Sequence, residues 1–120
     1  MLLNLSNHPS TAWSPEQLDA ATNQFGGVID KPFPNIDPYA TSEEVKLLVM
    51  EYGLRVANFK EAQLKAIHIM GEMTFVHHFI RIMETIQMPC YASTTERTVI
   101  EEADGRKTVQ FKFVQFRLYC

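Results

Sequence analysis

Hydrophobic and polar positions alternate along this chain in short blocks that predict strands and helices in turn. The apolar run of residues 1–5 leads into a polar stretch at 6–10, which is typical of a buried strand entering a loop. Residues 66–70 form a similar apolar run. Val28 and Ile29 predict only a very short strand. The following segment 31–38 contains three prolines, which lack a backbone donor, so it cannot continue a central strand and is expected to be an extended loop.

Helical spacing and capping signals mark three segments between these strands. Ser14 is a candidate N-cap with Gln17 three residues later, and Gly26 is a candidate stop signal. Thr41 and Glu44 form a second capping box in front of apolar residues at helical spacing. The expected helices are residues 15–26, 42–58 and 75–86, the last ending before Pro89.

The C-terminal part of the chain predicts a hairpin. Residues 90–92 form a fourth short strand, the polar stretch 93–97 follows as a loop, and 98–102 leads into a turn at Asp104-Gly105. Residues 108–119 are the returning strand, and their apolar positions change parity near Phe113 and Val114. A β-bulge or burial on both faces would explain this change. The aromatic residues here belong either to the core or a subunit interface, or to a platform for stacking bases.

Repeated strand-helix-strand units predict an α/β fold: a Rossmann-like, mostly parallel sheet flanked by helices, with a C-terminal antiparallel hairpin. The length of 120 residues fits one domain covering residues 1–120.

Composition and charge argue against long nucleic acids and membranes as partners. Hydrophobic residues make up 46% of the chain and charged residues 21%, which is an ordinary globular balance. A net charge of -3 gives no basis for binding long DNA or RNA. No apolar run reaches the length of a membrane span, and no signal peptide is recognisable, so a cytoplasmic protein without a membrane partner is expected. Cys90 and Cys120 are then expected to be reduced thiols.

Polar clusters follow each predicted parallel strand, at the edge where ligands of such sheets bind. We therefore expect four loops to converge on one site. They are residues 6–10, 31–38, 71–74 and 93–97.

Two residues in these loops are candidates for catalysis. His8 exchanges protons near neutral pH, and Ser6, Asn7 and Ser10 beside it could hold a phosphate. Alternatively, Asn7 and Ser10 only cap a turn and His8 is an ordinary surface residue.

Arg97 has the planar charged group that suits phosphate oxygens, with the hydroxyls of Ser93, Thr94 and Thr95 nearby in sequence. It could instead form an ion pair with Glu96 or Glu72.

The stretch from Gly71 through Glu72 to Thr74 is a third candidate. Gly71 could allow a ligand to approach the backbone, or it could simply permit a tight turn. Familiar motifs are missing elsewhere: neither a dinucleotide nor a nucleoside-triphosphate loop occurs, and His77 and His78 are adjacent and cannot share a metal ion. His68, in the middle of a strand, is expected in the core. No metal or cofactor is expected.

Four stretches taken together resemble a known family. They are residues 3–10, Pro32-Phe33-Pro34, Met70-Gly71-Glu72 and residues 92–97. The chain is similar over nearly its whole length to the small, stand-alone, CARF-related ring nucleases associated with type III CRISPR systems.

This resemblance implies a homodimer with a symmetric pocket for a cyclic oligoadenylate second messenger. The ring would be cut without a metal, by attack of its own ribose 2'-hydroxyl on the neighbouring phosphorus, which switches the antiviral signal off. His8 would transfer a proton and Arg97 would stabilise charge, acting as the catalytic pair. The ligand-binding residues would be Ser6, Asn7, Ser10, Gly71, Glu72, Thr74, Ser93, Thr94 and Thr95.

Three alternatives remain open. The protein could be a silent sensor or sponge that binds the same ring. It could be a small nucleoside- or nucleotide-processing enzyme with Glu72 or Glu96 as nucleophile. It could also be an interaction module whose loops perform no chemistry.

Overall fold

The protein is an α/β domain with a mostly parallel sheet and a C-terminal antiparallel hairpin, as the sequence predicts, and its five strands lie in the order β2-β1-β3-β4-β5. The computed structural model describes residues 1–59 and 63–119. Strands β1 to β4 are parallel, and β5 runs antiparallel to β4. The strands are β1 (Leu2–Ser6), β2 (Val28–Pro32), β3 (Ala66–Met70), β4 (Cys90–Glu101) and β5 (Lys107–Leu118). The helices are η1 (Ser10–Ala12), α1 (Pro15–Phe25), α2 (Ser42–Ala57) and α3 (Met73–Thr85).

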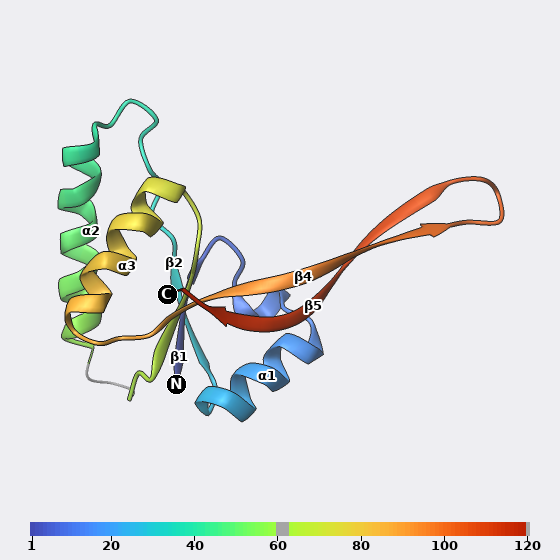
Figure 1. Ribbon diagram of the computed structural model, residues 1–120, viewed down its shortest axis with the longest axis horizontal. Coiled ribbons are helices and arrows are strands. Elements are labelled where there is room, and N and C mark those ends of the chain that lie inside the picture. Colours follow the sequence, from blue (N-terminus) through green and yellow to red (C-terminus); the bar gives the residue numbers. More distant parts are fainter. Residues whose placement is uncertain (60–62, 120) are drawn as a thin grey trace.

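Helices cover both faces of the sheet (Figure 1). Helices α2 and α3 pack together on one face, and α1 lies on the other. Strand β1 serves both cores, because Leu3 and Leu5 face α2 and α3 while Leu2 faces α1. The alternation of side chains along a strand explains this division.

The predicted helix boundaries are confirmed where capping signals marked them. The Ser14 hydroxyl accepts a hydrogen bond from the Gln17 backbone at the start of α1, and Gly26 ends that helix with a φ of 87°. Thr41 and Glu44 form the reciprocal capping box of α2. Local chemistry therefore sets the ends of these two helices.

Strand β2 is longer than the two residues expected and contains Pro32, so the loop prediction was wrong for residues 31 and 32 and is confirmed for residues 33–38. Its residues pair with β1 as far as Pro32 opposite Ser6. β2 is an edge strand with one neighbour, and an edge position tolerates the missing donor of proline.

Strand β4 also differs from the prediction, because the polar stretch 93–97 is not a loop. It lies within a continuous strand of 12 residues that pairs with β5 along its length. Pairing with β5, whose sequence is rich in aromatic and β-branched residues, outweighs the polar character of this stretch. The predicted bulge is confirmed: Thr94 pairs with Gln115 and Thr95 with Phe113, which leaves Val114 as the extra residue.

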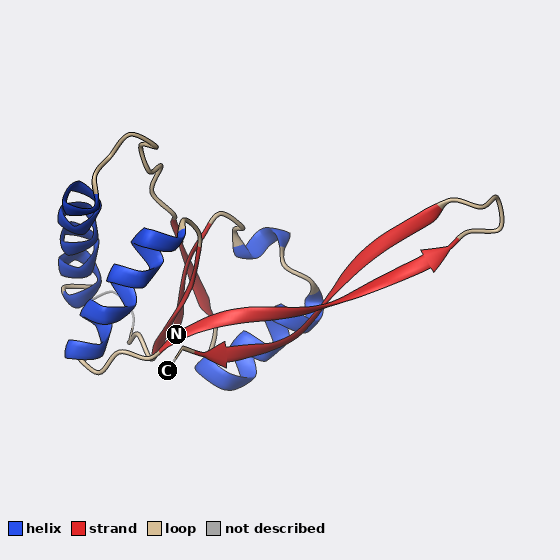
Figure 2. Cartoon of the chain, turned by 45° about the horizontal axis from the view of Figure 1, so that its top comes forward, coloured by secondary structure: helices blue, strands red, loops and turns tan. Residues whose placement is uncertain are grey.

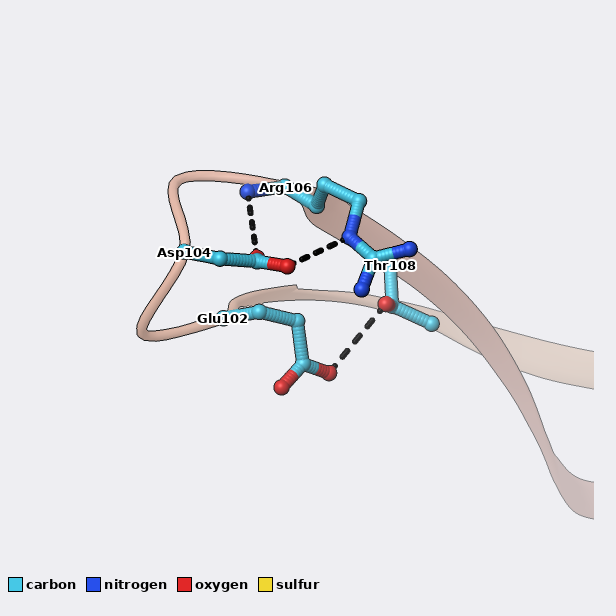
Figure 3. Close-up of polar contacts among 4 residues, drawn as sticks. All are labelled: Glu102, Asp104, Arg106 and Thr108. Atoms are coloured by element: carbon cyan, nitrogen blue, oxygen red, sulfur yellow. Dashed lines mark hydrogen bonds and ion pairs between the residues drawn. The ribbon is translucent and has the colours of Figure 1, made fainter.

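The outer half of the β4–β5 hairpin projects from the body as an arm (Figures 1 and 2). The radius of gyration is 16.3 Å, whereas a compact domain of this length has about 14 Å. At the tip, the Asp104 carboxylate accepts hydrogen bonds from the backbone and side chain of Arg106, and Gly105 takes a φ of 85° (Figure 3). The predicted Asp-Gly turn is therefore confirmed.

Two smaller expectations concern membranes and cysteines. Within residues 1–59 and 63–119, no helix has the length and apolar character needed to cross a membrane. Cys90 is a buried free thiol, and burial raises its pKa to about 12. Cys120 lies outside the described residues.

Candidate functional site

A row of polar residues crosses the α1 face of the otherwise apolar sheet. The strand register places Asn4 of β1 between Asp30 of β2 and His68 of β3. Asn4 and His68 are almost fully buried, at 1% and 2% exposure. Buried polar groups need hydrogen-bond partners, so this row must be a connected network.

The network runs across four strands. Asn4 Nδ2 donates to Asp30 Oδ1 at 2.8 Å, and Asn4 Oδ1 lies 2.8 Å from His68 Nδ1. His68 Nε2 in turn lies 3.0 Å from Ser93 Oγ of β4. The row thus connects a carboxylate on the edge strand to a hydroxyl on β4.

A cleft of about 630 Å³ opens above this row, at the carboxyl ends of β1 and β3. Chain connections leave β1 and β3 toward opposite faces of the sheet, since α1 and α3 cover different faces. This is the switch point at which open α/β sheets bind ligands. The cleft is lined by Ser6, Asn7, His8, Ala12, Trp13, Ser14, Gln17, His68, Met70, Gly71, Ser93, Thr95, Phe111 and Phe113.

The loop after β1 forms one wall of the cleft, as predicted. The backbone carbonyl of His8 accepts hydrogen bonds from Asn4 Nδ2, Ser6 Oγ and Trp13 Nε1 at 2.8, 3.1 and 3.1 Å. These bonds hold the loop backbone in place, while the His8 side chain stays exposed and lines the cleft. Asn7 is also exposed at this wall.

Ser10 has a structural task instead of a place in the cleft. Its backbone amide and hydroxyl both donate to the Asp30 carboxylate, at 2.9 and 2.7 Å. Partial burial opposes ionisation of Asp30, but hydrogen bonds from Asn4 and Ser10 outweigh it and lower the pKa of this carboxyl. Asp30 is therefore a fixed negative charge that anchors both the loop and the polar row.

The turn after β3 is mostly occupied by helix capping. The Glu72 carboxylate accepts from the Thr74 hydroxyl and from the backbone amides of Thr74 and Phe75, which caps α3. The Thr74 hydroxyl bond is the main reason that the pKa of Glu72 is lowered. Gly71 lines the cleft, and its hydrogen faces Phe33: a Cβ here would lie 2.4 Å from the Phe33 ring. Gly71 therefore allows close packing in addition to forming the cleft wall.

Strand β4 brings only part of its polar stretch to the cleft, because successive side chains of a strand alternate. Ser93 and Thr95 line the cleft, whereas Thr94 lies on the opposite face and donates to the Gln115 carbonyl. Arg97 is on the same face as Ser93 and Thr95 but farther out on the arm, opposite Phe111. The expected convergence of four loops is therefore wrong for residues 93–97, whose site residues come from a strand, and for residues 31–38, none of which lines the cleft.

Burial controls the charge of His68. Removal from water lowers its pKa to about 4, and the nearby charge of His8 adds to the effect. The rings of Trp13 and Phe116 pack edge-on against His68, with centroids 5.3 and 5.6 Å away. The imidazole is therefore neutral at physiological pH.

Asn4, Asp30 and Trp13 were not among the site residues expected from the sequence, and His68 was expected only in the core. One signal was present: Asn4 and His68 are polar residues inside apolar runs, and Asp30 directly follows Val28 and Ile29. Polar residues at matching offsets in three parallel strands indicate a shared network. Matching those offsets required the register of the strands, which sequence patterns leave open.

No group of three or more histidine, cysteine, aspartate or glutamate side chains that could hold a metal ion occurs in the described part of the chain.

Neither the curated proteins nor the solved structures contain a significant match to this sequence. One family model does match, over residues 1–117, and it carries the description "Uncharacterized protein MJ1673 family". The match covers nearly the whole chain, including every residue that lines the cleft. The chain therefore belongs to the MJ1673 family.

Proposed function

We propose that this protein is a ring nuclease, which binds a cyclic oligoadenylate and cleaves it without a metal to switch off type III CRISPR signalling. The observation that carries the proposal is the composition of the cleft. One cavity offers aromatic rings, hydroxyl groups and a histidine side chain at the switch point of the sheet. These are the groups needed to stack bases, bind phosphates and transfer protons.

The cleft suits an adenylate ring in several ways. Phe111 and Phe113 offer apolar rings for adenine at the cleft wall, and stacking on such rings does not require base-specific hydrogen bonds. Ser93 and Thr95 place hydroxyl groups on the cleft wall for phosphate or ribose oxygens, whereas the buried Ser6 hydroxyl is bonded to Asn4 and to the backbone of His8. A small ligand held this way is also compatible with the acidic net charge of -3.

The reaction would rely on positioning. The ribose 2'-hydroxyl attacks the adjacent phosphorus in line with the leaving 5'-oxygen, which produces a 2',3'-cyclic phosphate end. His8 would protonate the leaving oxygen, a role supported by its exposed side chain at the cleft wall. Arg97 is the candidate for stabilising charge on the phosphate oxygens.

A homodimer would bring Arg97 closer to the phosphate oxygens of the bound ring. Within one chain, no lysine or arginine lines the described cleft, and Arg97 projects from the arm beside it. Val99, Val109 and Phe111 share the face of the arm that bears Arg97, and they are 51%, 42% and 68% exposed. We propose a second copy of the chain as the partner of this face, acting in the cytoplasm, with no membrane and no long nucleic acid involved.

A non-catalytic sensor or sponge is the second candidate. The same lack of a lysine or arginine in the cleft lining favours it, because developing charge in the transition state would be less well stabilised. Alanine at His8 or Arg97 separates the two candidates. A nuclease would lose more turnover than affinity, whereas a sponge would show only the affinity loss.

The nucleoside-processing alternative has less support. Both oxygens of Glu72 are engaged at the N-terminus of α3. Glu96 pairs with Lys112 across the hairpin, on the face opposite Ser93 and Thr95.

The deciding experiment is incubation of the purified protein with cyclic tri-, tetra- and hexa-adenylate in excess EDTA, followed by mass spectrometry. We expect linear fragments that end in a 2',3'-cyclic phosphate from one of the rings. Intact rings that bind tightly would identify a sensor or sponge. Intact rings that do not bind would contradict both candidates.

A further inference from the structure

The buried network beneath the cleft has a defined direction. The Asp30 carboxylate and the His8 carbonyl only accept hydrogen bonds, so the group of Asn4 that contacts both must be its amide nitrogen. The other end, Asn4 Oδ1, is then an acceptor, and it lies 2.8 Å from His68 Nδ1. His68 Nδ1 must therefore carry the ring proton.

The remaining nitrogen of His68 follows from this assignment. In the neutral ring, Nε2 has a free lone pair, and it lies 3.0 Å from Ser93 Oγ. Ser93 Oγ also lies 3.1 Å from the sulfur of Met70. Because a thioether is a weak acceptor, the single hydroxyl proton of Ser93 points to His68 Nε2. The result is a hydroxyl at the cleft wall, backed by a base whose orientation is set from behind.

We propose that His68 is the proton acceptor of the cleft, that Ser93 passes the proton to it, and that Asn4 and Asp30 are positioning residues that select its tautomer. This inference rests on the proposed function. It adds a second histidine to the reaction, which divides proton transfer between a buried acceptor and the exposed donor His8.

The proposed cleavage step is balanced in protons and electrons. The ribose 2'-hydroxyl gives its proton to Ser93 Oγ while the Ser93 proton moves to His68 Nε2. The 2'-oxygen forms a bond to phosphorus, and the bond from phosphorus to the 5'-oxygen breaks. That oxygen takes a proton from the His8 imidazolium. His68 has gained one proton and His8 has lost one. His8 regains its proton from water, and the buried His68 returns its proton to water through the Ser93 hydroxyl.

The surroundings of His68 are compatible with this role. Burial keeps the ring neutral before reaction, so the lone pair is available at neutral pH, and the same burial lowers its basicity, which the charge of the ligand has to offset. Trp13 and Phe116 pack against the ring and restrict its rotation. The bound phosphodiester is an anion, and its charge would stabilise the imidazolium that forms.

The first test compares His68→Gln with His77→Gln during cleavage of the ring. Glutamine at position 68 can keep one donor and one acceptor, but it does not take up a proton. We expect kcat to fall by about 100-fold or more with KM within about threefold, because general-base catalysis contributes about that much. His77 is an exposed histidine on α3 and serves as the matched control. A kcat within about threefold of the wild type in His68→Gln would overturn the inference.

A second test uses the folded wild-type protein and does not depend on turnover. Long-range nitrogen-proton NMR correlations report which imidazole nitrogen carries the proton. We expect a protonated Nδ1 and a bare Nε2 on His68 at neutral pH, and a mixture of tautomers in Asn4→Ala. A proton on Nε2 in the wild type would overturn the inference, and an unchanged tautomer in Asn4→Ala would remove Asn4 from the positioning role.

The two proposals fail in different ways. If the wild type leaves every ring intact, the proposed function is wrong and the reaction assigned to His68 falls with it. If the wild type cleaves a ring and His68→Gln cleaves it equally well, only the role of His68 is wrong.

Discussion

At the scale of single residues, the buried histidine is the most consequential feature of this molecule. His68 is 2% exposed, and both of its ring nitrogens have hydrogen-bond partners. Its environment favours the neutral form, so its pKa is lowered to about 4 from the ordinary 6.5. A group this strongly perturbed affects folding as well as chemistry.

This shift predicts how stability depends on pH. The unfolded chain binds a proton at His68 more readily than the folded protein does, so stability falls as pH drops from 6.5 towards about 4. From about pH 7 to about pH 5, His68 should remove about 2 kcal/mol from the free energy of unfolding. Urea unfolding of the wild type and of His68→Gln measures this, because other groups titrate equally in both. Parallel pH curves for the two proteins would show that the shift is absent.

At the scale of elements, Glu72 shows how a site residue expected from sequence becomes part of a helix. Its carboxylate accepts hydrogen bonds from two backbone amides at the start of α3. The positive end of the helix dipole adds to the stabilisation of a negative charge there. The Glu72 carboxylate, which the sequence predicted to bind a ligand, instead accepts hydrogen bonds from the N-terminus of α3.

Removing this cap should cost stability and leave ligand affinity nearly unchanged. We expect Glu72→Ala to lower the free energy of unfolding by about 1 kcal/mol, the usual effect of losing an N-cap. Thermal or urea denaturation measures the loss, and calorimetric titration with the ring measures affinity. Glu96→Ala, an exposed position on β4, is the control. A large loss of affinity with unchanged stability would return Glu72 to the list of ligand-binding residues.

At the scale of the whole molecule, the arm dominates the shape. The longest dimension is 52 Å and the shortest 25 Å, and the outer half of the hairpin accounts for much of this elongation (Figure 1). Exposed apolar residues on a long two-stranded arm are costly for an isolated chain and are typical of an interface. The proposed homodimer would cover them.

This proposal predicts a dimer at micromolar concentration in sedimentation velocity. The double variant Val99→Thr and Val109→Thr keeps the shape of both side chains and should weaken dimerisation about tenfold or more, since about 1.4 kcal/mol corresponds to tenfold. Thr98→Ser, on the opposite face of the arm, is the control. A protein that is only monomeric, with and without ring ligand, would contradict the proposed homodimer.

Some structural elements could be predicted from the sequence and others could not. The caps of α1 and α2, the tip turn and the bulge in the hairpin all follow from local residue chemistry, and each was predictable. The length of β2 and the continuity of β4 were not, because edge position and strand pairing are properties of the assembled sheet. Tertiary pairing outweighed local preference at both places.

The candidate site divides in the same way. The sequence alone determined the α/β class and the position of a polar loop after β1, because periodicity and turn chemistry act over a few residues. Only the tertiary structure decided that Asp30, Asn4, His68 and Ser93 form one chain of hydrogen bonds. It also placed Thr94 outside the cleft and Glu72 on a helix. The physical reason is strand register, since a shift of one residue moves a side chain to the other face of the sheet and would take this network apart.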